Sequence, residues 1–252
     1  MATVSMSEEE INGIPAIHAV LADRASEPLP TIFFFHGFNT SSKEVTSYFG
    51  YMLAMAGFRV VLPEADLHGK RFAGDREARF GRFWEIVKRS IDELPRYRDH
   101  YEKRGLIDGD RVGIGGTSMG GMVTLGAMVA HPWVRAVASY MGSGYFIDLS
   151  RTLFPPRRTV GEEDAAWRDA VMAPLINHDA ARHLERLGDR PLFVWHGERD
   201  DVVPFAEAAR LRAELSARGL DKHLEFVSEP LGVHRVTHDA ATAGVQFFVR
   251  NL

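Results

Sequence analysis

The sequence predicts an α/β protein with a largely parallel central sheet covered on both faces by helices. Two observations lead to this prediction: short apolar runs rich in β-branched and aromatic residues recur along the chain, and amphipathic stretches of helical length separate them. The 252 residues, 45% of them hydrophobic, are enough to bury one sizeable core. We therefore expect a single domain spanning residues 1–252.

The expected elements alternate between strands and helices. The expected strands are Thr31 to Phe35, Phe58 to Leu62, Arg111 to Ile114, Val134 to Ser139, Pro191 to Trp195 and His223 to Val227. The expected helices are Lys43 to Ala56, Glu77 to Arg104, Met119 to Ala130, Phe205 to Arg218 and His238 to Asn251.

The segment from Gly144 to Asp189 interrupts this alternation. It carries Pro155 and Pro156, and short helix-like pieces follow before the next strand. An ordinary long connection is one interpretation. Loops of this length in compact domains usually carry function, so we expect residues 144–189 to form a small inserted cap or lid.

Composition excludes several classes of function. The net charge of −4 and the absence of a basic run argue against binding of nucleic acid or of an anionic membrane surface. The chain has no cysteine, which excludes disulfides, thiolate metal sites and cysteine nucleophiles. Residues 1–11 are polar and acidic, and no apolar run is long enough to span a bilayer. We expect a soluble, cytoplasmic protein with a small-molecule partner; the oligomeric state stays open.

A candidate nucleophile follows the expected strand Arg111 to Ile114. Gly116, Ser118 and Gly120 form a Gly-x-Ser-x-Gly pattern between a strand and a helix. Such a serine sits on a sharp turn, and glycines two before and two after it avoid side-chain collisions between closely packed backbones. The backbone N–H of Met119, at the start of the next helix, is then the natural donor to an oxyanion.

A serine nucleophile needs a histidine as base and an acid that orients the histidine. When the serine follows a strand of a parallel α/β sheet in this way, the acid and then the histidine come later in the chain. Glu198, Asp200 and Asp201 all stand in the turn after the strand Pro191 to Trp195, and spacing alone does not choose among them. All three also suit a solvated turn.

The base is expected in the loop after the strand His223 to Val227. Thr237 can cap the last helix, which places His238 in its first turn and leaves His234 in the loop. A loop histidine is free to face the serine, so we favour His234 as general base.

The second oxyanion donor is expected in the loop after the strand Thr31 to Phe35. We assign it to the backbone N–H of Phe38. His36, which ends that strand, and His196 are interpreted as residues that brace their loops through hydrogen bonds rather than as bases.

A catalytic metal is not expected. Glu64, Asp66 and His68 form a polar cluster at a strand end, but the chain has no convincing helical His-x-x-x-His pair: His234 and His238 have this spacing across a loop and a helix start.

With these residues identified, the chain resembles the small bacterial carboxylesterases of the α/β-hydrolase superfamily, in the branch near dienelactone hydrolase and the catalytic domain of prolyl oligopeptidase, and in particular the YjfP-type esterases. The resemblance covers nearly the whole chain. The motifs that carry it are His36 to Phe38, FRVVLPEADLH at Phe58 to His68, GGTSMGGM at Gly115 to Met122, MGSGYF at Met141 to Phe146, HGERDDVVP at His196 to Pro204 and GVHRVT at Gly232 to Thr237.

The resemblance implies an α/β-hydrolase fold, ester hydrolysis and no cofactor. It places the acid on Asp200, the fifth residue of the HGxxDxxVP pattern, and the base on His234. One departure is His238, where similar sequences tend to carry a different residue, so that a second histidine lies close to the proposed base and is able to perturb it.

The resulting hypothesis is a serine carboxylesterase for short-chain acyl esters, which uses Ser118, His234 and Asp200 and forms an acyl-enzyme intermediate. The alternatives are a peptidase, a dienelactone-hydrolase-like enzyme or a carbon–carbon bond hydrolase with the same triad, and a non-catalytic binding protein that keeps the fold.

Overall fold

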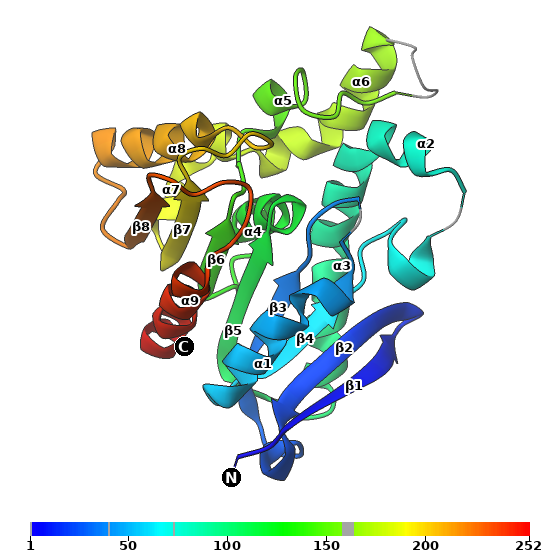
Figure 1. The fold of residues 1–252 in the computed structure, drawn as a ribbon, viewed down its shortest axis with the longest axis vertical. Helices are drawn as coiled ribbons and strands as arrows, with labels where there is room; N and C mark the ends of the chain where they lie inside the picture. The colour runs from blue at the N-terminus through cyan, green and yellow to red at the C-terminus, as the bar shows by residue number, and fades with distance from the viewer. Residues whose placement is uncertain (1, 40, 73, 158–163) are drawn as a thin grey trace.

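The computed structural model describes residues 2–39, 41–72, 74–157 and 164–252. In this part of the chain one sheet has the strand order β1-β2-β4-β3-β5-β6-β7-β8 (Figure 1). The predicted strands are confirmed, most of them with longer ends. The strands are β1 (Val4–Ile11), β2 (Ile14–Leu21), β3 (Leu29–Phe35), β4 (Arg59–Pro63), β5 (Ile107–Thr117), β6 (Ala136–Tyr140), β7 (Leu192–Gly197) and β8 (Leu224–Glu229).

The strands from β4 to β8 in this order pair in parallel, whereas β1 and β2 form an antiparallel hairpin that joins β4. This hairpin was not predicted from the sequence. Its turn is Asn12-Gly13, and both residues have positive φ angles (51° and 82°), as a tight two-residue hairpin turn requires. The Asn-Gly pair was therefore a signal that could have identified the hairpin.

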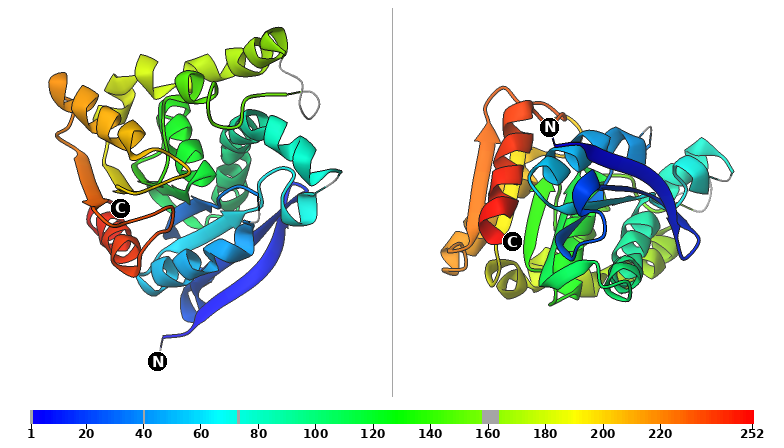
Figure 2. Two further views of the ribbon diagram at one scale, coloured as in Figure 1. Left: turned by 45° about the horizontal axis from the view of Figure 1, so that its top comes forward. Right: turned by 90° about the horizontal axis from the view of Figure 1, so that it is seen from below.

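The predicted α/β-hydrolase fold is confirmed by helices on both faces of the sheet (Figure 2). Successive side chains of β3 point to opposite faces of the sheet, and because both faces are covered, nearly the whole strand is apolar. Phe33 and Phe35 contribute to the core beneath α3 (Phe83–Glu102) and α4 (Met119–Ala130). Ile32 and Phe34 contribute to the core beneath α1 (Ser47–Met55) and α9 (His238–Asn251). The helices are α1 (Ser47–Met55), α2 (Arg76–Gly81), α3 (Phe83–Glu102), α4 (Met119–Ala130), α5 (Phe146–Leu149), α6 (Ala165–Met172), α7 (Leu184–Gly188), α8 (Phe205–Ala217) and α9 (His238–Asn251).

One predicted helix, Glu77 to Arg104, was wrong as a continuous element. It is divided into α2 and α3 at Arg82, whose φ and ψ of −105° and 10° leave the helical region. The Arg157 backbone N–H donates to the Gly81 carbonyl (3.1 Å), and a Cβ at Gly81 would lie 2.6 Å from the Arg157 carbonyl oxygen. The break is thus the place where a distant segment packs against the chain.

That distant segment belongs to residues 144–189, the predicted cap. In Figure 1, α5 and α6 stand at the end of the sheet toward which β5 points. The later part of the segment packs inward, where Leu175, Leu184 and Leu187 are buried in the core beside α4. Residues 158–163, in the middle of the predicted cap, lie outside the described residues.

None of the helices in the described ranges combines the length and the apolar character that are needed to cross a bilayer.

Candidate active site

Ser118 stands directly after β5, at the junction with α4. Its φ and ψ of 56° and −115° are unusual for a residue with a side chain, and its backbone N–H donates to the Tyr140 carbonyl of β6 (2.8 Å). A sharp turn of this kind raises the serine side chain above the carboxyl edge of the sheet.

The two glycines of the Gly-x-Ser-x-Gly pattern are needed for close backbone approach. A Cβ at Gly116 would lie 2.4 Å from the Gly120 carbonyl oxygen, and a Cβ at Gly120 would lie 2.1 Å from the Phe35 carbonyl oxygen. Both distances are far inside van der Waals contact, so the turn at Ser118 cannot form with larger residues at these positions.

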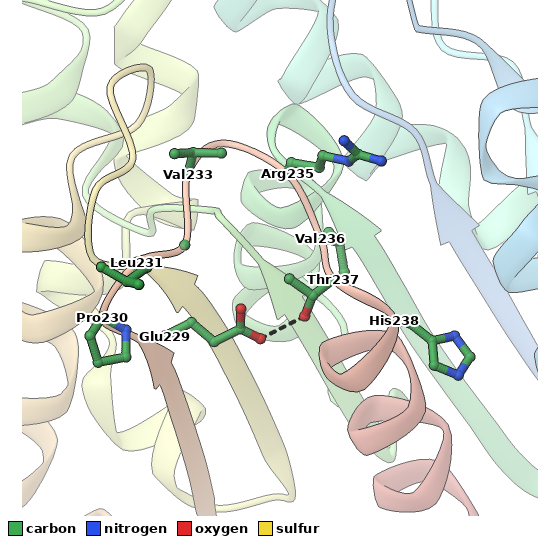
Figure 3. Close-up of a pocket in the computed structure, with 9 residues that line it drawn as sticks. Glu229, Pro230, Leu231, Val233, Arg235, Val236, Thr237 and His238 are labelled. Carbon is green, nitrogen blue, oxygen red and sulfur yellow. Dashed lines mark hydrogen bonds between the residues drawn. The ribbon is translucent and has the colours of Figure 1, made fainter.

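His234 lies in the loop between β8 and α9, as predicted. Thr237 is the N-cap of α9: its hydroxyl accepts from the Ala240 N–H (3.1 Å) and donates to the Glu229 carboxylate (2.6 Å) at the end of β8 (Figure 3). Gly232, in the same loop, packs so closely on Gly197 that a Cβ on Gly197 would lie 2.4 Å from the Gly232 backbone. These contacts fix both ends of the loop that carries the histidine.

The structure brings Ser118, His234 and Asp200 together. His234 Nε2 lies 2.9 Å from Ser118 Oγ, and His234 Nδ1 lies 2.9 Å and 2.8 Å from the two carboxylate oxygens of Asp200. The hydroxyl can donate to Nε2 only if the imidazole proton is on Nδ1, where it donates to Asp200. This geometry permits His234 to accept the proton of Ser118.

Asp200 is held by more than His234. Its carboxylate accepts the N–H groups of Val202 and Val203 (both 2.9 Å), and His196 Nε2 lies 3.2 Å from it. Burial alone would raise the pKa of Asp200, but hydrogen bonds from His196, His234 and the Val202 amide outweigh burial and hold this pKa well below the usual range. These contacts therefore favour the carboxylate form of Asp200.

The three acids of the turn differ sharply in environment. The Asp200 side chain is 0% exposed. Asp201 is exposed, and Glu198, also exposed, accepts the Ser228 hydroxyl (2.8 Å). Among these acids, the described hydrogen bonds join only Asp200 to His234.

His238 does not pair with the proposed base. Its Nδ1 hydrogen-bonds the hydroxyl of Tyr48 in α1, and within the described residues no hydrogen bond joins it to Ser118, Asp200 or His234. Among the described residues, His238 therefore makes no hydrogen bond through which it would perturb His234 directly.

The two proposed oxyanion donors flank Ser118. Met119 is the first residue of α4, so its backbone N–H has no acceptor within the helix. Phe38 follows β3, and a Cβ at its neighbour Gly37 would lie 3.6 Å from Ser118 Cβ. The loop after β3 therefore passes directly beside the serine.

Comparison with known proteins identifies the family of this chain. The family model described as the prolyl oligopeptidase family matches residues 47–249. The chain is also 44% identical over 252 residues to the protein named Esterase YjfP of Escherichia coli strain K12, with 99% of this chain and 100% of that protein covered. The chain belongs to the prolyl oligopeptidase family. As a member of this family it is an enzyme, a serine hydrolase, and we do not retain the alternative of a non-catalytic binding protein.

Solved structures share the fold of this family member at low identity. The TT1662 protein of Thermus thermophilus matches with a TM-score of 0.77 and 22% identity over 99% of this chain and 100% of its own. A puromycin-hydrolyzing peptidase of Mycobacterium tuberculosis matches with a TM-score of 0.71 and 20% identity over 98% of this chain, but over 39% of its own length.

A groove of about 820 Å³ lies along the loop that carries His234 (Figure 3). Its described lining comes from residues 229–233 and 235–238 and includes Leu231 and Val233, which are 71% and 50% exposed. None of the triad side chains is among these lining residues, so the groove is a feature of the outer side of the loop.

The polar cluster at the end of β4 is engaged in protein contacts. Glu64 accepts the backbone N–H and the ammonium of Lys43 (3.1 Å and 3.2 Å), His68 Nε2 accepts the Asn39 N–H (3.1 Å), and Asp66 accepts from Arg89 (2.8 Å). These contacts connect the end of β4 with the loop after β3, in which Phe38 lies.

His68 should make the stability of this hydrolase depend on pH. Burial lowers the pKa of His68 to about 4, and nearby cationic groups such as Arg79 add to this effect, although a hydrogen bond to the Asp66 carbonyl opposes it. Between the ordinary histidine pKa of about 6.5 and the folded value, the unfolded chain takes up a proton that the folded chain does not. Folding stability attributable to His68 is therefore complete above that window and falls by about 3 kcal/mol across it.

The measurement is the free energy of unfolding in urea between about pH 7 and 4, for the wild type and His68→Gln. The glutamine side chain can accept the Asn39 N–H but does not titrate, so the wild type should lose stability more steeply. Parallel curves for the two proteins would contradict the buried neutral state of His68.

Proposed function

We propose that the protein is a carboxylesterase in which Ser118 is the nucleophile, His234 the general base and Asp200 the residue that orients and stabilises the imidazolium. The observation that supports this most directly is the continuous set of hydrogen bonds from Asp200 through His234 to Ser118. The high identity to a protein named as an esterase, over the whole length of both chains, favours ester substrates.

The proposed reaction has two acyl-transfer steps. Ser118 Oγ attacks the ester carbonyl carbon while His234 Nε2 takes the hydroxyl proton, and the N–H groups of Phe38 and Met119 stabilise the oxyanion. The tetrahedral intermediate expels the alcohol, which takes its proton from His234. Water then attacks the acyl-enzyme by the same route and releases the carboxylic acid.

The direct test combines labelling with turnover. A fluorophosphonate probe should modify Ser118, as located by mass spectrometry of the digested protein, and p-nitrophenyl acetate should be hydrolysed with a burst of p-nitrophenol if deacylation is slow. Labelling at another residue, or none, would contradict the assignment of the nucleophile.

A peptidase is the second candidate because the family takes its name from an oligopeptidase and a structural neighbour hydrolyses puromycin. Aminoacyl p-nitroanilides, compared with p-nitrophenyl esters by kcat/KM, separate the two activities. We propose that the ester is preferred, since an ester carbonyl has less resonance stabilisation than an amide carbonyl and an alkoxide is a better leaving group than an amide anion.

The acyl group is expected to be short. The ring of Phe38 is packed against Phe83 and Phe154, with ring centroids 4.9 Å and 5.2 Å away, and Phe154 comes from the predicted cap. A longer acyl chain gains about 0.8 kcal/mol for each buried methylene, whereas overfilling a packed pocket costs about 1–3 kcal/mol. We therefore expect acetate to butyrate esters to be the best substrates.

A p-nitrophenyl ester series from acetate to palmitate measures this dependence as kcat/KM. Phe154→Ala provides the comparison, because removal of this ring should move the optimum toward longer chains while p-nitrophenyl acetate remains a substrate. A wild-type rate that rises steadily to palmitate would show that the cap does not limit the pocket.

A further inference from the structure

The peptide unit between Gly37 and Phe38 carries both a potential oxyanion donor and a carbonyl that is already bound. The Phe38 N–H and the Gly37 carbonyl belong to the same planar amide and point in opposite directions. His36 Nδ1 lies 2.7 Å from the Gly37 carbonyl oxygen. Whatever fixes the direction of this carbonyl therefore also fixes the direction of the Phe38 N–H.

The partners of His36 determine where its proton lies. The Gly37 carbonyl can only accept, so Nδ1 must carry the hydrogen. The Ala65 N–H can only donate, and it lies 3.0 Å from Nε2, so Nε2 must be unprotonated. Glu64 lies beside Nε2 at 3.3 Å, but its carboxylate is held by Lys43. His36 itself is 1% exposed, which isolates this arrangement from water.

We propose that His36 is a positioning residue for the oxyanion hole: its Nδ1–H donates to the Gly37 carbonyl and thereby aims the Phe38 N–H at the substrate oxyanion that forms when Ser118 attacks. This inference rests on the proposed function. A hydrogen bond accepted by the carbonyl also polarises the amide, so the same N–H becomes a better donor in a buried site.

Neighbouring contacts hold the next peptide in the same loop. The Asn39 N–H donates to His68, and the Asn39 side-chain oxygen accepts from Arg79 (3.0 Å), whose guanidinium also lies 5.6 Å from the centre of the Phe38 ring. These contacts fix the chain after Phe38, whereas His36 is the side chain that holds the peptide unit before it. The role of His36 is thus separable from the general rigidity of the loop.

Two isosteric substitutions separate the two nitrogen atoms of the ring. In His36→Asn the side-chain NH₂ can take the place of Nδ1–H and donate to Gly37, but the acceptor for Ala65 is lost. In His36→Gln the side-chain oxygen can take the place of Nε2 and accept from Ala65, but the donor to Gly37 is lost. If His36 positions the Phe38 N–H, kcat should fall more in His36→Gln than in His36→Asn. If His36 only braces the loop, kcat should fall equally in the two variants or more in His36→Asn.

The readouts are kcat and KM for p-nitrophenyl acetate and the inhibition constant of a trifluoromethyl ketone, which Ser118 converts to a hemiketal with an oxyanion. Loss of a complete oxyanion donor costs about 10²–10³ in kcat, so misalignment in His36→Gln should cost about 10- to 100-fold, with KM nearly unchanged. The inhibition constant should rise by a similar factor. His36→Asn should retain kcat within about fivefold of the wild type.

Equal kcat in the two variants, or a greater loss in His36→Asn, would overturn the positioning role. Nitrogen NMR of histidine-labelled wild-type protein tests the tautomer even if a variant fails to fold: protonated Nδ1 and unprotonated Nε2 at His36 support the proposal, and the opposite tautomer overturns it. Fluorophosphonate labelling of wild-type Ser118 is measured in parallel. Its failure would refute the proposed function, whereas normal labelling with equal kcat in both variants would refute only the role of His36.

Discussion

Replacement of Ser118 by alanine is expected to reduce esterase turnover by about 10⁴- to 10⁶-fold while the fold is retained. Ser118 Oγ is the atom that His234 Nε2 contacts at 2.9 Å, and alanine removes that atom without adding volume to a turn in which glycine backbones are already in contact. Activity toward p-nitrophenyl acetate and labelling by a fluorophosphonate should be lost together.

Ser228→Ala is a suitable control, because Ser228 lies on β8 and its hydroxyl donates to exposed Glu198 rather than to the triad. This variant should keep wild-type kcat/KM. Thermal unfolding of both variants checks that a loss of rate is not a loss of folded protein. An active Ser118→Ala protein, purified free of other esterases, would refute the proposed nucleophile.

Asp200→Asn should lower kcat by about 10⁴-fold, whereas Asp201→Asn should change it little. The carboxylate of Asp200 accepts the Nδ1 proton of His234, and an amide at this position would favour the imidazole tautomer that cannot accept the serine proton. Asp201 is one residue away and exposed to solvent. Asp201→Asn is therefore a matched control: it makes the same change of charge and of side chain as Asp200→Asn, one residue away.

The measurement is kcat and KM for p-nitrophenyl acetate in both variants, with the thermal unfolding midpoint as a check on folding. A similar loss of kcat in the two proteins would mean that Asp200 acts through the stability of the turn. The expected pattern is a selective loss of kcat in Asp200→Asn, with little change in KM.

The strands β3, β4, β6 and β7 were predictable because they are buried on both faces. β3 illustrates this: consecutive phenylalanines contribute to cores on opposite sides of the sheet, so the whole run is apolar. β1 was not predictable in this way, because it is an edge strand of mostly exposed residues such as Glu8 and Glu10. Its only clear signal was the Asn12-Gly13 turn.

The division between α2 and α3 was also not predictable from local pattern. Helical periodicity continues through Arg82, and the reason for the break is a contact with Arg157, far away in the sequence. Likewise, much of the predicted cap contributes to the core through Leu175 and Leu184, since an apolar residue in a short helix can pack inward or outward.

By itself, the sequence predicted the turn that carries the proposed nucleophile and the loop that carries His234, because Gly116 is required by the close approach of Gly120, four residues later, and Thr237 caps the start of α9. These are short-range constraints, which a pattern of residues expresses directly. The choice among three adjacent acids was different: spacing left it open, and it rested on a resemblance until the structure showed which carboxylate is buried against His234.

Only the tertiary structure showed what surrounds these residues. His196 lies beside Asp200, and His36 donates to the Gly37 carbonyl of the peptide unit that carries the Phe38 N–H. The hydroxyl of Tyr48 hydrogen-bonds His238. For His196 and His36, the sequence indicated only that they brace loops. The partner atom of a hydrogen bond, and hence a histidine's tautomer, depends on which segments meet in space, and that is decided by packing of the whole sheet rather than by residues close together in the chain.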